Sequence, residues 1–154
     1  MSNYELVPFE DPAKLADAVA QAWISELQRI ASRQTPFCLA LSGGRIARQV
    51  FSSAAARAKS HGFRLDGVEF FWGDERCVVP TDPESNYLLA NELLLKPLEI
   101  PEGRIHRVRG EEEPTFAAAQ AEAEICRIAP LDPDGQPAEP GARRDDGLPL
   151  PPRR

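Results

Sequence analysis

The stretch LALSGGRIARQVF, residues 39–51, joins an apolar run to an amphipathic run through two adjacent glycines. Its first part belongs to FCLALS, residues 37–42, whose nearly continuous apolar character is typical of a strand buried on both faces. Its last part opens the alanine-rich run 45–60, which predicts a helix because its large apolar residues recur on one face. A strand, a tight glycine turn and a helix are therefore expected here.

Strand and helix signals alternate along the rest of the chain as well. VEFFWG at 68–73 is bounded by glycines and rich in strand-favouring residues, and GRIHRV at 103–108 predicts a brief third strand. Such alternation implies parallel strands joined by right-handed crossovers, with helices on both faces of the sheet. We therefore predict an α/β fold, a Rossmann-like three-layer αβα arrangement with a mostly parallel sheet. Helices are expected over residues 12–30, 45–60, 85–98 and 114–129.

The predicted helices should bury their large apolar residues. The first helix has Asp11 available as its cap and Pro12 at its first position, where proline is favoured. Spacings of three and four residues define the face that each of the first three helices should turn inward. These faces consist of Leu15, Val19, Trp23, Leu27 and Ile30, then Ile46, Val50 and Phe51, then Leu88, Leu89, Leu93 and Leu94.

Composition limits the class of protein. The 154 residues suffice for one domain, and 42% hydrophobic with 27% charged residues is ordinary for a soluble globular protein. The formal net charge of -6 argues against nonspecific nucleic-acid binding, because an acidic field repels a phosphate polymer. The start of the chain lacks the pattern of a signal peptide, and no apolar run is long enough to span a membrane. We therefore expect a cytoplasmic protein with no membrane partner.

The cysteine pattern agrees with a reducing compartment. Cys38, Cys77 and Cys126 are odd in number, far apart and without CxxC spacing. This pattern favours reduced thiols over a disulfide framework or a zinc site. We expect all three to be structural, because a free cysteine usually packs as a small buried hydrophobe.

The composition changes abruptly near the end of the chain. Residues 131–154, LDPDGQPAEPGARRDDGLPLPPRR, are rich in proline, glycine and charge and show no apolar periodicity. We therefore expect the folded α/β domain to occupy residues 1–130 and a disordered tail to occupy residues 131–154.

The glycine turn Ser42-Gly43-Gly44-Arg45 is the first candidate ligand site. It is expected at the carboxyl edge of the sheet, which is where open parallel sheets bind ligands. Glycine lets the backbone approach a ligand closely, and the helix N-terminus offers free N–H groups to an anion. The turn therefore predicts a phosphate site, with a merely tight turn as the alternative.

The loop after the second strand, Asp74-Glu75-Arg76, is expected at the same edge. Arginine suits bidentate recognition of phosphate or carboxylate, and an adjacent acid can orient it or exchange protons with a substrate. A solvated, salt-bridged turn is the alternative interpretation. Because both loops follow consecutive strands, we predict that they form one site.

These motifs, read together, resemble a known family. Two segments are similar to the 6-phosphogluconolactonases in the order of their motifs and in residue identity. They are LSGG followed by a helix, and then FFWGDERCVVPTDPESNYLLANELLLKPLEIPEGRIHRV at 70–108. That family shares its fold with the glucosamine-6-phosphate isomerases and deaminases. The resemblance extends over residues 8–129. It implies hydrolysis of 6-phospho-D-glucono-1,5-lactone to 6-phosphogluconate, in the oxidative pentose phosphate pathway, without a metal or organic cofactor.

The resemblance also implies roles for particular residues. Ser42 to Gly44 correspond to part of the phosphate and sugar site, and Arg76 to an anion-binding residue. Asp74 matches the acid that transfers a proton in the isomerase relatives. Ser85 and Asn86 match a pair that lines the pocket, and a helix-capping role for Ser85 is compatible with this. An aminosugar-phosphate isomerase and a noncatalytic phosphosugar-binding remnant are the alternatives to a lactonase.

The sequence departs from the family pattern in two places. Arg45-Ile46-Ala47 stand where members of the family continue with a hydroxyl residue and proline, so that a cation replaces a hydroxyl donor. The family's Gly-x-Gly-x-Asp-Gly-His segment, whose histidine is the expected general base, does not occur. His61 and His106 lie in other contexts and are expected to be ordinary surface or half-buried histidines. We therefore expect a fold that is incomplete on its C-terminal side, an uncovered sheet edge that a partner chain could complete, and a tail that comes from a frameshift or a fragmentary gene model.

Overall fold

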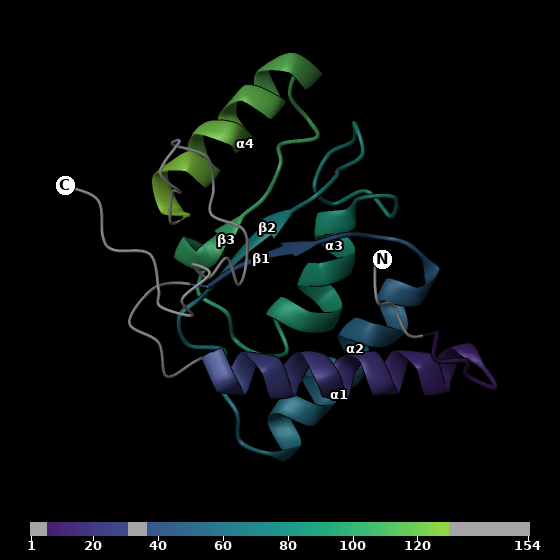
Figure 1. Ribbon diagram of the computed structural model, residues 1–154. Helices are drawn as coiled ribbons and strands as arrows, with labels where there is room; N and C mark the ends of the chain where they lie inside the picture. The colour runs from purple at the N-terminus through teal and green to yellow at the C-terminus, as the bar shows by residue number, and fades with distance from the viewer. Residues whose placement is uncertain (1–5, 31–36, 130–154) are drawn as a thin grey trace, which may run out of the picture.

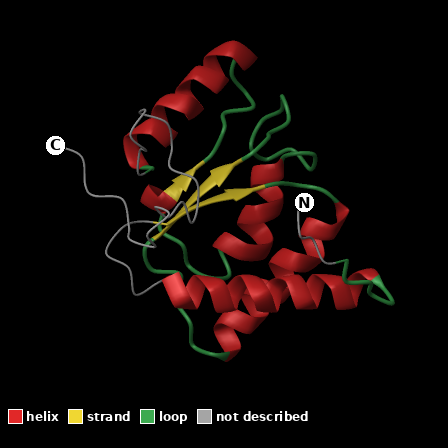
Figure 2. Cartoon of the chain, in the orientation of Figure 1, coloured by secondary structure: helices red, strands yellow, loops and turns green. Residues whose placement is uncertain are grey.

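Three short strands form a parallel sheet in the order β1-β2-β3. The computed structural model describes residues 6–30 and 37–129, and the predicted tail at 131–154 lies outside them. The chain alternates between strands and helices, as the sequence predicts (Figures 1 and 2). The elements are α1 (Pro12–Ile30), β1 (Phe37–Leu41), α2 (Arg45–Ser60), β2 (Val68–Trp72), α3 (Asn86–Ala90), the π-helical turn η1 (Asn91–Leu95), the 3-10 turn η2 (Glu102–Arg104), β3 (Ile105–His106) and α4 (Pro114–Ile128).

Helices cover both faces of the sheet, so the predicted α/β architecture is confirmed. Alternate residues of β2, namely Val68, Phe70 and Trp72, are buried in the main core with residues of α1, α2 and η1. The opposite face carries Glu69 and Phe71 and is turned toward α4, which Figure 1 shows across the sheet from α1 and α2. The central strand is therefore covered on both sides, which explains its near-continuous apolar sequence.

The buried faces of α1 and α2 differ from the predicted ones. Val19 is 42% exposed and Ile46 is 39% exposed. The two helices are in contact, and Ala20, Ala54 and Ala58 are fully buried. Of the larger residues predicted to face inward, Leu27 and Phe51 are buried as well.

The predicted helix 85–98 is one α-helical turn followed by a π-helical turn. In η1, the N–H of Lys96 donates to the carbonyl of Asn91 at 2.9 Å, five residues back. Leu94 and Leu95 are both fully buried, whereas the other leucines of this segment stay partly exposed. The π-helical turn thus contributes two consecutive leucine side chains to the core.

The three cysteines, which were expected to be structural, are not all buried. Cys38 is half-buried, whereas Cys77 and Cys126 are exposed, and all three are free thiols. Cys77 lies in the loop after β2 and Cys126 on the outer side of α4, where no core is available to them.

Within residues 6–30 and 37–129, no helix combines the length and the apolar character that crossing a membrane requires.

Candidate functional site

The register of β1 and β2 brings the two predicted ligand loops together. Leu41 pairs with Trp72, and the N–H of Gly73 continues the ladder by donating to the Leu41 carbonyl at 2.9 Å. Both loops therefore leave the sheet at the same level. As a result, the hydroxyl of Ser42 donates to Oδ1 of Asp74 at 2.9 Å, although 32 residues separate the two in sequence.

The Asp74 carboxylate is held from a second side by Asn86, at the start of α3. Nδ2 of Asn86 lies 3.2 Å from Oδ2 of Asp74 and 3.1 Å from its backbone carbonyl. Asn86 is only 4% exposed. A Cβ atom on Gly43 would lie 1.8 Å from Oδ1 of Asn86, so this position accommodates only glycine. Ser42 and Asn86, from two separate segments of the chain, thus fix the direction of one carboxylate.

The second glycine of the turn shapes the start of α2. Gly44 has φ 104°, a conformation that favours glycine, and it occupies the N-cap without any side-chain hydrogen bond to the helix. The first N–H groups of α2 are thus left without a side-chain cap, next to the exposed Arg45. An uncapped helix N-terminus beside a guanidinium is suited to an anion.

The Glu75 carboxylate is occupied by donors of the protein itself. Its carboxylate accepts hydrogen bonds from the N–H groups of Asn86 and Tyr87, both at 2.8 Å. It also accepts from the N–H of Arg76 at 2.7 Å and from the hydroxyl of Ser85 at 3.2 Å. These bonds satisfy the start of α3 and leave little capacity for a ligand. Glu75 therefore supports the start of α3.

Ser85 caps α3, as one of its two predicted roles requires. Its hydroxyl accepts a hydrogen bond from the N–H of Leu88 at 3.1 Å and donates to Glu75. The side chain is buried. Its hydroxyl bonds within the protein, so Ser85 helps to hold Glu75 and the start of α3 in place.

Arg76 supplies the site with a cation whose backbone is held by its neighbours. Its backbone N–H is bonded to Glu75, and its carbonyl accepts from the N–H of Val78 at 2.8 Å. Its exposed guanidinium makes no hydrogen bond or ion pair with any residue that the structure describes. A fixed backbone with an unpaired guanidinium is well suited to binding an anion from solution.

Neither histidine lies beside Asp74 with a free ring nitrogen. His61 caps the far end of α2, about 24 Å from Gly44 at the rise of a 16-residue helix. His106 is only 7% exposed, and its ring nitrogens lie 2.8 Å from Oε2 of Glu69 and 2.9 Å from Oε1 of Glu124. The prediction that both are ordinary histidines agrees with these positions.

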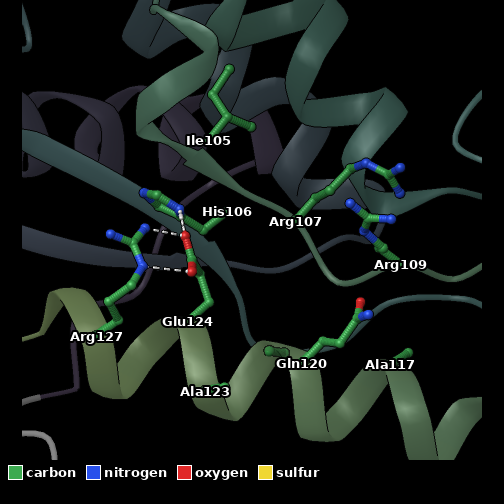
Figure 3. A pocket seen from close by; sticks show the side chains of 10 residues that line it. Ile105, His106, Arg107, Arg109, Ala117, Gln120, Ala123, Glu124 and Arg127 are labelled. Atoms are coloured by element: carbon green, nitrogen blue, oxygen red, sulfur yellow. Dashed lines mark hydrogen bonds and ion pairs between the residues drawn. The ribbon is translucent and has the colours of Figure 1, made fainter.

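His106 belongs to a polar cluster that the sequence analysis missed. Arg127 donates to Glu124 with two nitrogens, at 2.9 and 2.6 Å (Figure 3). Because the His106 ring of β3 contacts both Glu124 of α4 and Glu69 of β2, the cluster connects α4 to the two strands. The cluster borders a cavity of about 560 Å³ between β3 and α4. Arg107 and Arg109 lie at the other end of this cavity in Figure 3.

Within the described ranges, no group of histidine, cysteine and acidic residues has an arrangement suited to a metal ion.

Acid should weaken this cluster. The Arg127 guanidinium, and then His106, lower the pKa of Glu124 from 4.5 to about 2, and Arg107 lowers that of Glu111 to about 2 in the same way. Because these carboxyls titrate lower in the folded chain, the stability they contribute is present above about pH 4.5 and is lost as the pH falls toward 2. We expect urea midpoints to fall between pH 5 and 3, and to fall less steeply in Glu124→Gln. Glu122→Gln, which changes an exposed acid on the same helix, should fall as steeply as the unaltered chain. A fall as shallow as that of Glu124→Gln would contradict the prediction.

Two further residues near the site also escaped the sequence analysis. Arg107 lies with its guanidinium carbon 5.6 Å from the centre of the Tyr87 ring, and Gly110 lies against the backbone of residues 76–78. Both follow β3, and the carboxyl ends of parallel strands meet at one edge. Their position directly after the third predicted strand could therefore have placed them at the same edge as the site.

The fold and the position of the site define a class of protein. They place the chain among the α/β proteins that carry their ligand site at the carboxyl ends of parallel strands, beside a glycine turn and a helix N-terminus. A family model described as glucosamine-6-phosphate isomerases/6-phosphogluconolactonase matches residues 10–139. The chain belongs to this family.

Named relatives and solved structures agree with the family. The 6-phosphogluconolactonase of Haemophilus influenzae is 34% identical over 130 residues, which are 83% of this chain and 53% of the relative. That of Treponema pallidum is 41% identical over 119 residues, 76% of this chain and 46% of the relative. In the crystal structure of the Thermotoga maritima 6-phosphogluconolactonase the sequence is 25% identical to this chain. The TM-score is 0.69, and the match covers 80% of this chain and 54% of that one. The chain therefore spans about half the length of the relatives it matches.

Proposed function

We propose that this chain binds a phosphorylated six-carbon sugar acid or lactone and forms the substrate-binding part of a 6-phosphogluconolactonase. The observation that carries the proposal is the Asp74 carboxylate, which Ser42 and Asn86 hold at the edge where α2 begins. The unpaired guanidinium of Arg76 belongs to the same loop. A fixed carboxylate and a free cation suit a ligand that has hydroxyl groups at one end and a phosphate at the other.

Each residue then has a role that follows from its contacts. Arg76 and the first N–H groups of α2 bind the phosphate, with Arg45 as a second cation. Lactone hydrolysis adds water to the carbonyl carbon and returns a proton to the ring oxygen, so a group that exchanges protons must stand near the carbonyl. Asp74 is that group in our proposal, because Glu75 is occupied by α3.

Two observations bear on the alternatives and on the compartment. The relatives reported above are named 6-phosphogluconolactonases, which supports a lactonase over an aminosugar-phosphate isomerase. Cys38, Cys77 and Cys126 are free, and this fits the cytoplasm, where thiols stay reduced.

Binding of 6-phosphogluconate to the purified chain tests the proposal directly. Calorimetry should show saturable binding that inorganic phosphate competes for, because both ligands need the same anion site. Absence of binding by a chain that circular dichroism shows to be folded would overturn the proposal. The matching assay measures 6-phosphogluconolactone hydrolysis above the spontaneous rate, with glucosamine 6-phosphate turnover as the readout for the isomerase alternative.

A further inference from the structure

The loop that carries Arg76 is held between two segments of the chain. On one side, the Glu75 carboxylate fixes the N–H of Arg76 and joins it to the start of α3. On the other side, the backbone at Gly110 lies directly against the Arg76 carbonyl. The second contact brings in the segment that follows β3, to which the proposed function assigns no role.

Gly110 is glycine because of space and not because of backbone conformation. A Cβ atom at this position would lie 2.0 Å from the Arg76 carbonyl oxygen and 2.9 Å from that of Val78, well inside van der Waals contact. Its φ is not in the left-handed region, which among the described glycines is limited to Gly44, Gly62 and Gly67. The φ at 110 therefore does not exclude alanine, and the atoms nearest to its Cβ would belong to the Arg76 loop.

The segment around Gly110 is itself anchored. Arg107 donates to both carboxylate oxygens of Glu111, at 2.8 and 2.6 Å, and it lies over the Tyr87 ring. The N–H of Tyr87 in turn donates to the Glu75 carboxylate. The two supports of the Arg76 loop are thus connected through Tyr87, and they hold the loop as one unit.

We propose that Gly110 is a positioning residue for Arg76, and that the segment 107–111, pinned by the Arg107–Glu111 pair, sets where the Arg76 guanidinium meets the ligand phosphate. The inference rests on the proposed function, since the ligand is the phosphosugar. A bidentate contact to phosphate needs a fixed guanidinium position, and a displacement of about 1 Å in a binding loop can cost a large factor in recognition.

A double-mutant cycle tests this inference with 6-phosphogluconate as the probe. In the unaltered chain, Gly110→Ala should raise the Kd about tenfold. In the Arg76→Ala background the same change should raise the Kd by less than about twofold, because the residue through which it acts is gone. Gly103→Ala is the matched control, because a Cβ atom there meets nothing within 4 Å. It should leave the Kd unchanged in both backgrounds.

The other outcomes are equally decisive. An equal loss of affinity in both backgrounds would show a general structural role for Gly110 and would overturn the inference. So would an unchanged Kd in Gly110→Ala, while the proposed function would stand as long as the unaltered chain binds. If the unaltered chain does not bind 6-phosphogluconate, both fall.

A second variant keeps the test open if Gly110→Ala does not fold. Glu111→Gln removes the charge that pins Arg107 but keeps the shape of the side chain. In the same cycle it should raise the Kd about threefold with Arg76 present and leave it unchanged with Arg76 absent. Equal effects in the two backgrounds would again overturn the inference.

Discussion

Replacing Glu75 with alanine should lower the free energy of unfolding by about 2–4 kcal/mol, because it removes a charged acceptor that several donors share. The N–H groups of Asn86 and Tyr87, at the start of α3, would both lose their partner. Asn86 is buried, so water replaces the lost acceptor only in part. Urea denaturation at neutral pH measures the effect.

Glu84→Ala is the matched control for this change. Glu84 is an exposed acid that immediately precedes Ser85, the N-cap of α3, and no hydrogen bond or ion pair of its side chain occurs within the described residues. Its replacement should change stability by less than about 0.5 kcal/mol. Glu75→Gln should lie between the two, since an amide keeps one of the two acceptor oxygens. Equal stabilities for Glu75→Ala and Glu84→Ala would refute the capping role.

Arg76→Ala should weaken 6-phosphogluconate binding by about 1.5–3 kcal/mol, which is roughly a 10- to 100-fold rise in Kd, because a charge-assisted contact to phosphate is lost. Stability should hardly change, since the guanidinium has no partner among the described residues. Calorimetry and thermal unfolding on the same preparation separate the two effects.

Arg64→Ala controls for the loss of one positive charge. Arg64 is exposed and precedes β2, so it lies at the edge of the sheet opposite to Asp74. Its removal should leave the Kd unchanged apart from a small screened effect. A Kd for Arg76→Ala within twofold of that for Arg64→Ala would remove Arg76 from the site.

Much of the fold could be predicted because its signals are local. The start of α1 at Pro12, the bounds of α2 at 45–60 and the start of α4 at Pro114 agree with the sequence pattern. The predicted faces were less accurate where two helices meet. Periodicity marks the large residues as buried, yet Val19 and Ile46 are exposed, whereas Ala20, Ala54 and Ala58 are fully buried. Packing against a partner is not a property of one helix, so a single-helix pattern does not contain it.

The roles within the site show the same division. That Ser42, Gly43 and the loop 74–76 meet at one edge could be predicted from the sequence alone, because parallel strands place their carboxyl ends together. Which contacts each of the two acids makes depends on the tertiary structure. Asp74 meets Ser42 and Asn86, whereas Glu75 turns to the start of α3. Neighbouring side chains on an irregular loop point in directions set by the contacts they find, and here those contacts come from residues that are distant in the sequence.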